Sequence, residues 1–351
     1  MKKDNKNRRL RLYDPLRDGK GVSKNDKAPH GSIKRFFISY KDNFGKIISA
    51  NIFMVLGNFP LIFLIAVLSG VTKADAFLPM QDLFQNLAPV FATEAPSAAG
   101  MTMYSLFGIQ NQILVDTTLS YVFYGISALV LFTFGLVNVG TAYILRNIAK
   151  GEPVFVFSDF WYAVKRNWRQ ALPFGIIDVI INAVLLVNIY TLAINNQSFI
   201  ESFMLWTNII IFVLYFFMRY YVYVQMVTFK LTVFKIIKNS LIFALLGIKR
   251  NIMALLGIAL VILLEVLFIF GLGGFLLPFG VAMPLAVMFS TLAYMKVYAA
   301  YYKIKDVMID PYLAEHPEEA PDVAQDEVIM RDDVTEKERL EEIKKRNGIT
   351  E

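Results

Sequence analysis

The chain is divided into long apolar blocks separated by shorter polar and charged segments. A helix needs about 20 consecutive, mostly apolar residues to cross the hydrocarbon core of a bilayer. Six blocks reach this length, at residues 47–71, 119–145, 171–194, 203–227, 252–271 and 275–298. The pattern predicts an all-α integral membrane protein with six transmembrane helices, because a helix satisfies its own backbone hydrogen bonds inside lipid.

A basic amphipathic segment precedes the third block. Its large apolar side chains recur every three or four residues, which is the spacing of one helix face. They are Phe157, Phe160, Trp161, Val164 and Trp168. The basic side chains of Lys165, Arg166 and Arg169 fall outside this stripe. The pattern predicts a helix in the plane of the lipid headgroups, followed by a basic hinge and then by the membrane helix.

The same arrangement recurs before the first and fifth blocks. Each copy contains Lys, any residue, Asn and then an apolar residue, at 41–44, 165–168 and 249–252. We therefore predict three units, each a cytoplasmic amphipathic helix followed by a helical hairpin. Asn is a favoured N-cap, so Asn43, Asn167 and Asn251 are expected to cap the odd-numbered membrane helices.

A functional interpretation of the repeat stays open beside the structural one. The repeated basic segments are also candidates for a surface that docks another protein. The candidate docking residues are Asp159, Trp161, Lys165, Arg166, Asn167, Trp168, Lys249, Arg250 and Asn251.

Basic residues are distributed unequally between the connecting segments. Segments 146–170 and 228–250 each hold five Lys and Arg, whereas loop 72–118 holds only Lys73 and loop 195–202 holds none. Lys and Arg accumulate in cytoplasmic loops. Together with six spans, this bias predicts a multi-pass protein of the cell membrane with both termini in the cytoplasm.

Three regions follow from these blocks. Residues 1–30 are predicted to be a disordered basic tail, 31–305 the six-helix membrane domain, and 306–351 an acidic, mostly disordered tail. Within the acidic tail, the capping-box spacing at 335–338 predicts a short helix over 336–346. The external loop 72–118 is expected to form short helices on the outer surface or folded over the helix ends, and a lid or partner-binding role is the alternative.

Three ionisable residues lie inside the apolar blocks, where a charge is costly. Asp178 and Arg219 fall at similar depth in the neighbouring third and fourth spans, which predicts an ion pair. A substrate or proton path through Asp178 is the alternative. Glu265 in the fifth span has no obvious partner.

Uncharged residues inside the spans are candidates for contacts between helices. Amide side chains are expected to hydrogen-bond from helix to helix, and small residues to allow close packing. The amides are Asn58, Asn138, Asn182 and Asn188, and the small residues are Gly125, Ser127, Gly135 and Gly140.

Composition and missing motifs exclude several functional classes. The chain has no Cys, and its two His residues, His30 and His316, lie in the tails. It contains no G-x-x-x-x-G-K-[ST], H-E-x-x-H or G-x-S-x-G motif and no recognisable ATPase-coupling loop of an ABC permease. We therefore expect neither an enzyme nor a cofactor or metal site. The net charge of +6 follows from the loop bias and does not indicate a nucleic-acid partner.

The region from residue 137 to 186 resembles the YesL-like family of bacterial integral membrane proteins. The resemblance rests on an Arg-Asn helix exit, a Ser-Asp-Phe and a Lys-x-Asn-Trp-x-Gln-Ala that leads into a membrane helix. The matching residues are Gly140, Arg146, Asn147, Ser158, Asp159, Phe160, Lys165, Asn167, Trp168, Gln170 and Ala171. The resemblance extends over 119–300, whereas loop 72–118 is longer than is typical of the family.

The resemblance implies a function without assigning any catalytic residue. The family is of unknown activity, is typical of Gram-positive bacteria and is often encoded beside carbohydrate ABC transporters. It implies a non-enzymatic protein that is accessory or regulatory to a carbohydrate uptake system, with the lipid bilayer and ABC-transporter subunits or another membrane protein as partners. The alternative is a small-solute transporter or channel with a polar path at Asp178, Arg219 and Glu265.

Overall fold

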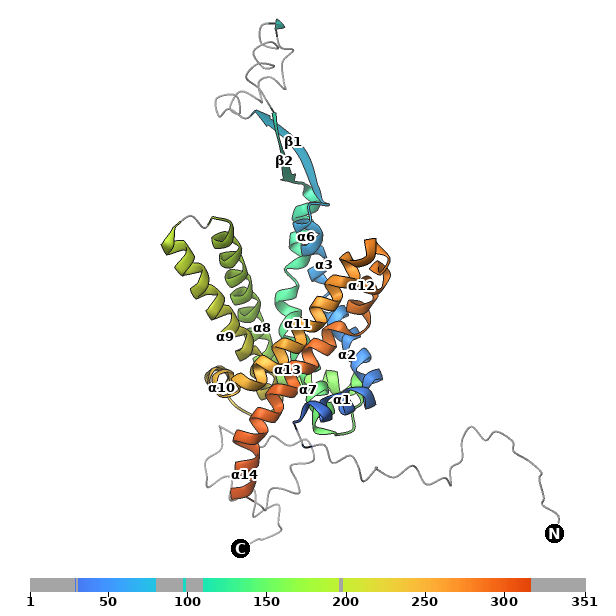
Figure 1. Cartoon of the computed structure of the whole chain (residues 1–351), viewed down its shortest axis with the longest axis vertical. Helices are drawn as coiled ribbons and strands as arrows, with labels where there is room; N and C mark the ends of the chain where they lie inside the picture. Colours follow the sequence, from blue (N-terminus) through green and yellow to red (C-terminus); the bar gives the residue numbers. More distant parts are fainter. Residues whose placement is uncertain (1–28, 30, 80–96, 99–109, 196–197, 317–351) are drawn as a thin grey trace, which may run out of the picture.

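The computed structural model describes residues 29, 31–79, 97–98, 110–195 and 198–316, and most of them are helical (Figure 1). Five helices are long and apolar enough to cross a membrane, and α2 with α3, bent by 61° at their junction, makes a sixth if the pair is one span. The prediction of an α-helical, multi-pass membrane protein is therefore confirmed. The predicted helix 336–346 and all of the predicted tail 1–30 except residue 29 lie outside the described residues.

Apart from the segment between β1 and β2, most of the described elements follow one another with short connections. In chain order they are α1 (Ile33–Asp42), α2 (Phe44–Gly57), α3 (Pro60–Leu68), β1 (Lys73–Pro79), β2 (Gln110–Asp116), α6 (Thr118–Ser127), α7 (Val130–Lys150), α8 (Val156–Ile194), α9 (Phe199–Thr228), α10 (Val233–Leu246), α11 (Ile248–Phe270), η1 (Gly271–Gly274), α12 (Leu277–Met283), η2 (Pro284–Met288), α13 (Phe289–Ile304), η3 (Lys305–Ile309) and α14 (Asp310–Glu315). The last helix lies within the segment that the sequence assigned to the acidic tail.

The loop between the first two spans begins and ends as a two-stranded antiparallel ribbon. β1 pairs with β2 in a register that places Lys73 opposite Asp116, and their side chains form an ion pair of 3.5 Å. Short helices were expected for the apolar pieces at 75–91 and 97–109. The prediction is wrong for residues 75–79, which belong to β1. The two ends of the loop pair with each other, so their backbone N–H and C=O groups form hydrogen bonds from strand to strand. Residues 80–96 and 99–109 of the loop lie outside the described part.

Helix α8 is continuous over 39 residues, with Pro173 inside it. The predicted basic hinge near Arg169 is therefore wrong as a break in the helix. Phe160 and Val164 are buried before this point and Ala171 is buried after it. One face of the same helix packs on both sides of the basic residues, and this packing favours a continuous backbone.

Helices α7 and α8 cross at two glycines. A Cβ atom built on Gly135 would lie 2.0 Å from the carbonyl oxygen of Ala171, and one built on Gly175 would lie 2.5 Å from the Cα of Gly135. A Cβ on Gly140 would lie 2.5 Å from the Phe160 ring, whereas one on Gly125 would meet nothing within 4 Å. The predicted role in close packing is confirmed for Gly135 and Gly140 and is wrong for Gly125.

The sixth span contains a π-helical segment, η2, that is held by a side chain from the first span. Pro284 lacks an N–H group, and a π-helical turn leaves backbone groups without regular partners. The Nδ2 of Asn51 donates to the carbonyl oxygens of Pro284 and Leu285, both at 2.9 Å, and its Oδ1 accepts from the Ser290 N–H at 2.9 Å. Asn51, which is fully buried, thus links α2 to the irregular part of the sixth span.

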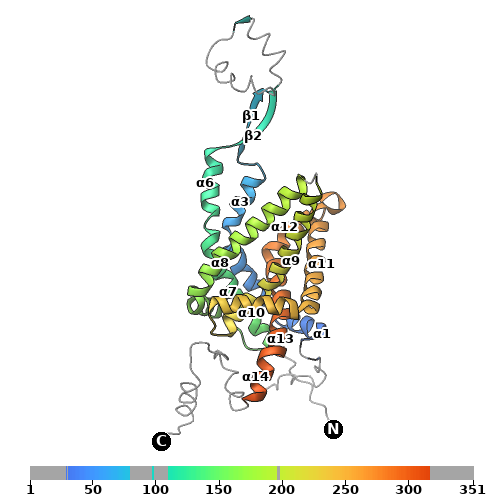
Figure 2. The ribbon, with the colours of Figure 1, turned by 90° about the vertical axis from the view of Figure 1, so that its left-hand side faces the viewer.

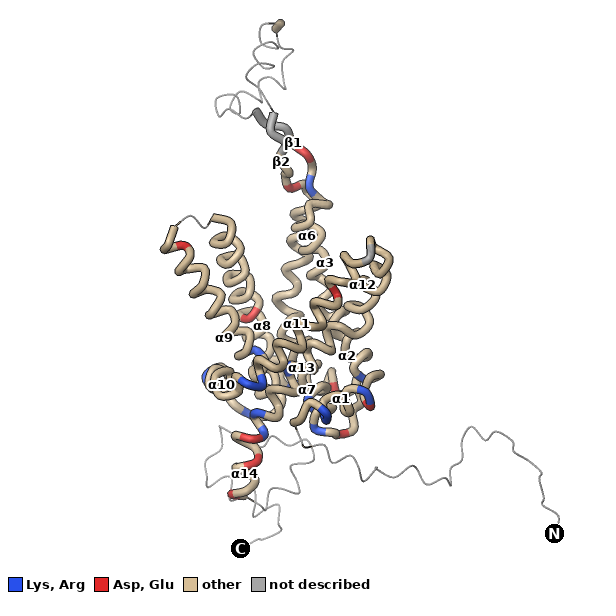
Figure 3. Tube along the Cα trace, in the orientation of Figure 1, with Lys and Arg blue, Asp and Glu red and all other residues tan. Residues whose placement is uncertain are grey.

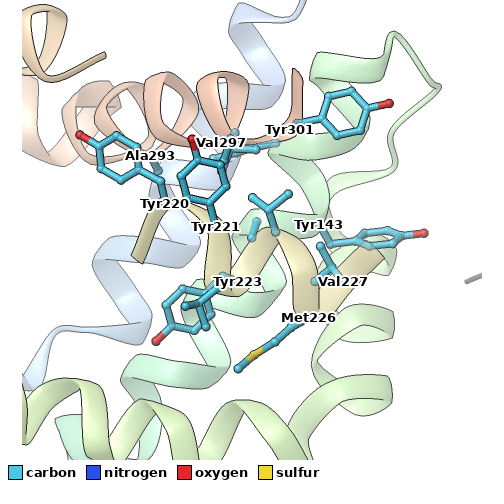
Figure 4. Packing of buried hydrophobic residues seen from close by; sticks show 14 of the residues in the cluster. Tyr143, Tyr220, Tyr221, Tyr223, Met226, Val227, Ala293, Val297 and Tyr301 are labelled. Carbon is cyan, nitrogen blue, oxygen red and sulfur yellow. The ribbon is translucent and has the colours of Figure 1, made fainter. Parts of the chain in front are cut away.

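The buried core lies at one end of the long helices, between α7, α9 and α13 (Figure 4). In α9 every buried residue lies from Phe217 onward, and in α13 burial extends from Ser290 to Ile304. Tyrosines of α13 tie this end together. Tyr294 donates to the hydroxyl of Ser39, and the Tyr302 hydroxyl donates to the Ala149 carbonyl, both at 2.9 Å. The last turn of α7 therefore belongs to the core, and α1, which has no buried residue, packs against it.

The predicted asparagine caps are not formed. Asn43 occupies the N-cap position of α2 but makes no side-chain cap hydrogen bond. Asn167 lies inside α8 and donates to the Ala163 carbonyl at 2.9 Å. Asn251 lies within the first turn of α11, where its Oδ1 accepts from the Tyr221 hydroxyl at 2.7 Å. Contacts with other parts of the fold or with the preceding turn replace the predicted local cap.

Replacing the crossing glycine tests the close contact of α7 and α8. We expect Gly135→Ala to destabilise the fold by about 1–3 kcal/mol, because overpacking forces helices apart. Gly125→Ala is the matched control, since its Cβ enters open space and should leave stability unchanged or slightly raised. Thermal unfolding in detergent measures both. Equal unfolding temperatures for the two variants would contradict the close crossing.

Candidate functional site

Asp178 of α8 is the centre of a buried polar network between α8 and α9. Its side chain is fully buried. Oδ1 accepts from the Asn182 Nδ2 and the Tyr215 hydroxyl, each at 2.8 Å, and Oδ2 accepts from the Tyr223 hydroxyl at 2.9 Å. The Arg219 Nε lies 2.8 Å from Oδ1 and 3.1 Å from Oδ2. The structure thus joins Asp178 and Arg219 as the sequence predicted.

Helical spacing places these groups opposite one another. Tyr215, Arg219 and Tyr223 are separated by four residues each and share one face of α9. On α8, Gly175 and Asp178 are three residues apart, so the face that crosses α7 closely also carries the carboxylate. The spacing on α9 is a signal that sequence reasoning did not use.

The arrangement leaves the carboxylate little chemical freedom. A carboxylate offers about four acceptor positions. Three neutral donors and one guanidinium already occupy those of Asp178, and the guanidinium balances its charge. A proton carrier or a ligand-binding acid needs an open position, so the geometry favours an internal ion pair.

Glu265, the third predicted intramembrane site residue, is not joined to this pair. It lies on α11, is 8% exposed, and its Oε1 has no hydrogen-bond partner among the described residues. The structure records no hydrogen bond or ion pair between Glu265 and either Asp178 or Arg219. The predicted polar path through all three residues is therefore not assembled by direct contacts.

Lys296 of α13 is an ionisable residue that sequence reasoning missed, although it falls inside the predicted sixth span. It lines a cavity of about 40 Å³ together with Arg219, Tyr220 and Asn138. Its Nζ lies 6.0 Å from the centre of the Phe216 ring. The rule that identified Asp178, namely a charge within an apolar block, would also have identified Lys296.

Arg146 of α7 is a second buried cation, and it has a structural role. Its Nη1 donates to the Val227 carbonyl at 2.6 Å and to the Thr228 hydroxyl at 3.4 Å. Its Nε and Nη2 donate to the side chain of Asn147. Arg146 therefore lies at the negative end of the α9 dipole and satisfies a terminal carbonyl there.

Only part of the predicted docking set is exposed. Trp161 and Trp168 are 44% and 49% exposed, and Lys165 and Lys249 are exposed. Arg169 lies over the Trp168 ring at 5.6 Å. Exposed aromatic and basic side chains on one helix are typical of the membrane interface.

Other members of the docking set make internal contacts. Asp159 Oδ2 accepts from the backbone N–H of Phe155 at 2.8 Å and so caps α8. Arg166 donates to the Tyr162 hydroxyl at 2.8 Å, and Arg250 pairs with Asp306 at 2.9 Å. Asn251 is fully buried, and Asn167 bonds within its own helix. These residues are less available to a partner than the two tryptophans.

The amides predicted to connect helices mostly bond within their own helix. The Nδ2 atoms of Asn58 and Asn138 donate to the carbonyls of Met54 and Phe134 at 2.9 and 2.8 Å. Asn182 contacts Asp178 of the same helix. The prediction is wrong for these three, because a carbonyl one turn earlier is always within reach.

The architecture defines the chain as a multi-pass α-helical membrane protein. Within it, residues 114–189 match the sequence model of a family described as "Protein of unknown function, DUF624". The match runs from β2 through α6 and α7 into α8 and includes both the glycine crossing and Asp178. It agrees with the predicted resemblance to a membrane family of unknown function.

The other comparisons add no relative. None of the curated proteins and none of the solved structures compared with the chain matches it. Within the described residues, no group of three or more His, Cys, Asp or Glu side chains is arranged to hold a metal ion.

Removing the central carboxylate tests its structural role. Asp178→Ala leaves Arg219 buried without its counter-ion, and we expect a loss of about 3–5 kcal/mol in stability. The double variant Asp178→Ala with Arg219→Leu should recover part of that loss, because no charge is then stranded. Thermal unfolding in detergent measures the change, with Glu265→Gln as a control expected to stay within about 1 kcal/mol of the wild type. Wild-type stability of Asp178→Ala would contradict this role.

Proposed function

We propose that the chain is a non-enzymatic membrane protein that is accessory or regulatory to a carbohydrate uptake system of the ABC type. The observation that carries this proposal is the saturated network around Asp178, where the carboxylate pairs with Arg219 and accepts three further hydrogen bonds. A transporter needs polar groups that bind and release a solute. The most prominent intramembrane acid of this chain is instead fully engaged within the fold.

The docking surface in this proposal is the exposed part of the basic segment of α8, formed by Trp161, Lys165 and Trp168. Exposed tryptophan is enriched at the centres of protein interfaces. Because Trp161 and Trp168 are seven residues apart, they share a helix face. The carbohydrate context comes from the family resemblance alone. The proposed partner is a transporter subunit that contacts α8 at the membrane surface.

The orientation belongs to the same proposal. We place three helix pairs in the membrane, and contacts of α3 with α6, α8 with α9 and α11 with α12 support them. Lys and Arg gather at one end of the described helices (Figure 3). At that end α10 lies across the bundle, end-on in Figure 1 and lengthwise in Figure 2, as an in-plane surface helix would. The basic end faces the cytoplasm.

A transporter or channel remains the second candidate function. The small cavity beside Arg219 and Lys296 is the observation in its favour. Lys296 would then replace Glu265 in the polar path, because Glu265 does not line that cavity.

The absence of Cys makes the orientation directly testable. Asp75→Cys in β1 should react with a membrane-impermeant maleimide in intact cells. Lys165→Cys in α8 should react only after the membrane is permeabilised. Both positions are exposed, so reactivity reports the side of the membrane. Labelling of Lys165→Cys in intact cells would overturn the orientation.

Affinity capture in mild detergent tests the accessory function. We expect carbohydrate ABC-transporter subunits to co-purify with the wild type and to be reduced about tenfold or more with Trp161→Ala and Trp168→Ala combined, because interface aromatics contribute most to binding. Trp206→Ala is the matched control, since Trp206 is 64% exposed on α9, away from this surface. Solute flux in vesicles that contain this protein alone would favour the transporter instead.

A further inference from the structure

A small cavity with a partly polar lining lies between α7, α9 and α13, next to the Asp178–Arg219 pair. Its volume is about 40 Å³, and its polar lining includes Asn138 of α7, Arg219 and Tyr220 of α9, and Lys296 of α13. Figure 4 shows Tyr220 directed toward α13, beside Ala293 and Val297. Helices α9 and α13 thus bring two cationic side chains to one cavity, and α7 adds an amide.

The charges around this cavity do not balance. Asp178 faces Arg219 and neutralises it. Lys296 is partly buried and makes no hydrogen bond or ion pair with any residue that the structure describes, and its recorded contact is the ring of Phe216. The site therefore carries one positive charge in excess, which is costly inside a membrane.

A hydrogen-bond donor at the same cavity is also unused. Tyr220 is 2% exposed, and its hydroxyl has no hydrogen-bond partner among the described residues. A buried hydroxyl without a partner costs free energy, so such groups usually bind water or a ligand. An excess cation and an unpaired donor together are the chemistry that recognises an anion.

The size of the cavity limits the anion. The cavity holds about three water-sized groups at most, since each needs about 10–15 Å³. A lipid phosphate or a sugar does not fit within about 40 Å³. Water alone would satisfy the Tyr220 hydroxyl but would leave the charge of Lys296 uncompensated. A monovalent ion of the size of chloride satisfies both requirements.

We propose that this cavity binds a single chloride-sized anion, held by the ammonium group of Lys296 and the hydroxyl of Tyr220. The bound ion completes the charge balance between α9 and α13 and stabilises their packing. The site is independent of the docking surface on α8, so it does not rest on the proposed accessory function.

The site is tested by measuring the unfolding temperature in chloride, in bromide and in gluconate at constant ionic strength. Gluconate is the control anion, because it is too large to enter the cavity. The wild type should gain stability with chloride and bromide in a saturable way. Lys296→Met should lose this dependence, and Lys296→Arg should retain it. Lys303→Met is the control, since it removes the same charge from the same helix outside the cavity, and it should behave as the wild type does.

A second variant keeps the proposal testable if Lys296→Met does not fold. Tyr220→Phe keeps the ring and removes only the hydroxyl, and we expect the half-saturating chloride concentration to rise about tenfold, as for loss of one hydrogen bond to a charged group. An unchanged half-saturation in Tyr220→Phe, no saturable effect in the wild type, or an equal effect in Lys296→Met overturns the proposal. Loss of the effect in Lys303→Met as well would indicate surface ion binding only and would also overturn it.

Discussion

The close crossing of α7 and α8 is the constraint on which the rest of the membrane region depends. Gly135 and Gly175 have no room for a side chain at this crossing, so the two helix backbones touch. Asp178 follows Gly175 by one helical turn on the same face of α8. The crossing therefore fixes where the carboxylate lies, and Tyr215 and Tyr223 of α9 must pack so that their hydroxyls reach it.

A charge buried among membrane helices is stable only when its hydrogen bonds and its counter-ion come from the protein. Asp178 obtains both from α9, and Arg146 obtains carbonyl acceptors at the end of the same helix. Helix α9 is therefore held at two places along its length: Arg219 pairs with Asp178 of α8, and the Val227 carbonyl accepts from Arg146 of α7. These polar contacts determine the relative positions of helices, which lipid-facing apolar side chains alone would leave poorly specified.

The features that depend on segment length and on charge were predicted from the sequence. The predictions failed where residues distant in the chain compete for the hydrogen bonds of a side chain. Apolar block length predicted the spans, and equal depth in adjacent spans predicted the pair of Asp178 with Arg219. Asn251 was expected to cap its own helix, but the Tyr221 hydroxyl and a carbonyl of α10 take its side chain. No pattern in the sequence around Asn51 predicts its hydrogen bonds to the π-helical segment, because the partners lie more than 200 residues away.

Most of the buried core lies in the half of the bundle next to the basic segments, while the far halves of α8 and α9 are largely exposed. Such a protein responds unequally to bilayer thickness. The far helix pairs are able to tilt to meet a hydrophobic mismatch, at a cost of fractions of a kcal/mol per Å, while the packed half keeps its shape. A change in lipid composition would consequently move the far ends of α8 and α9 and leave the surface with the basic segments in place, so the molecule is compliant on one side and stiff on the other.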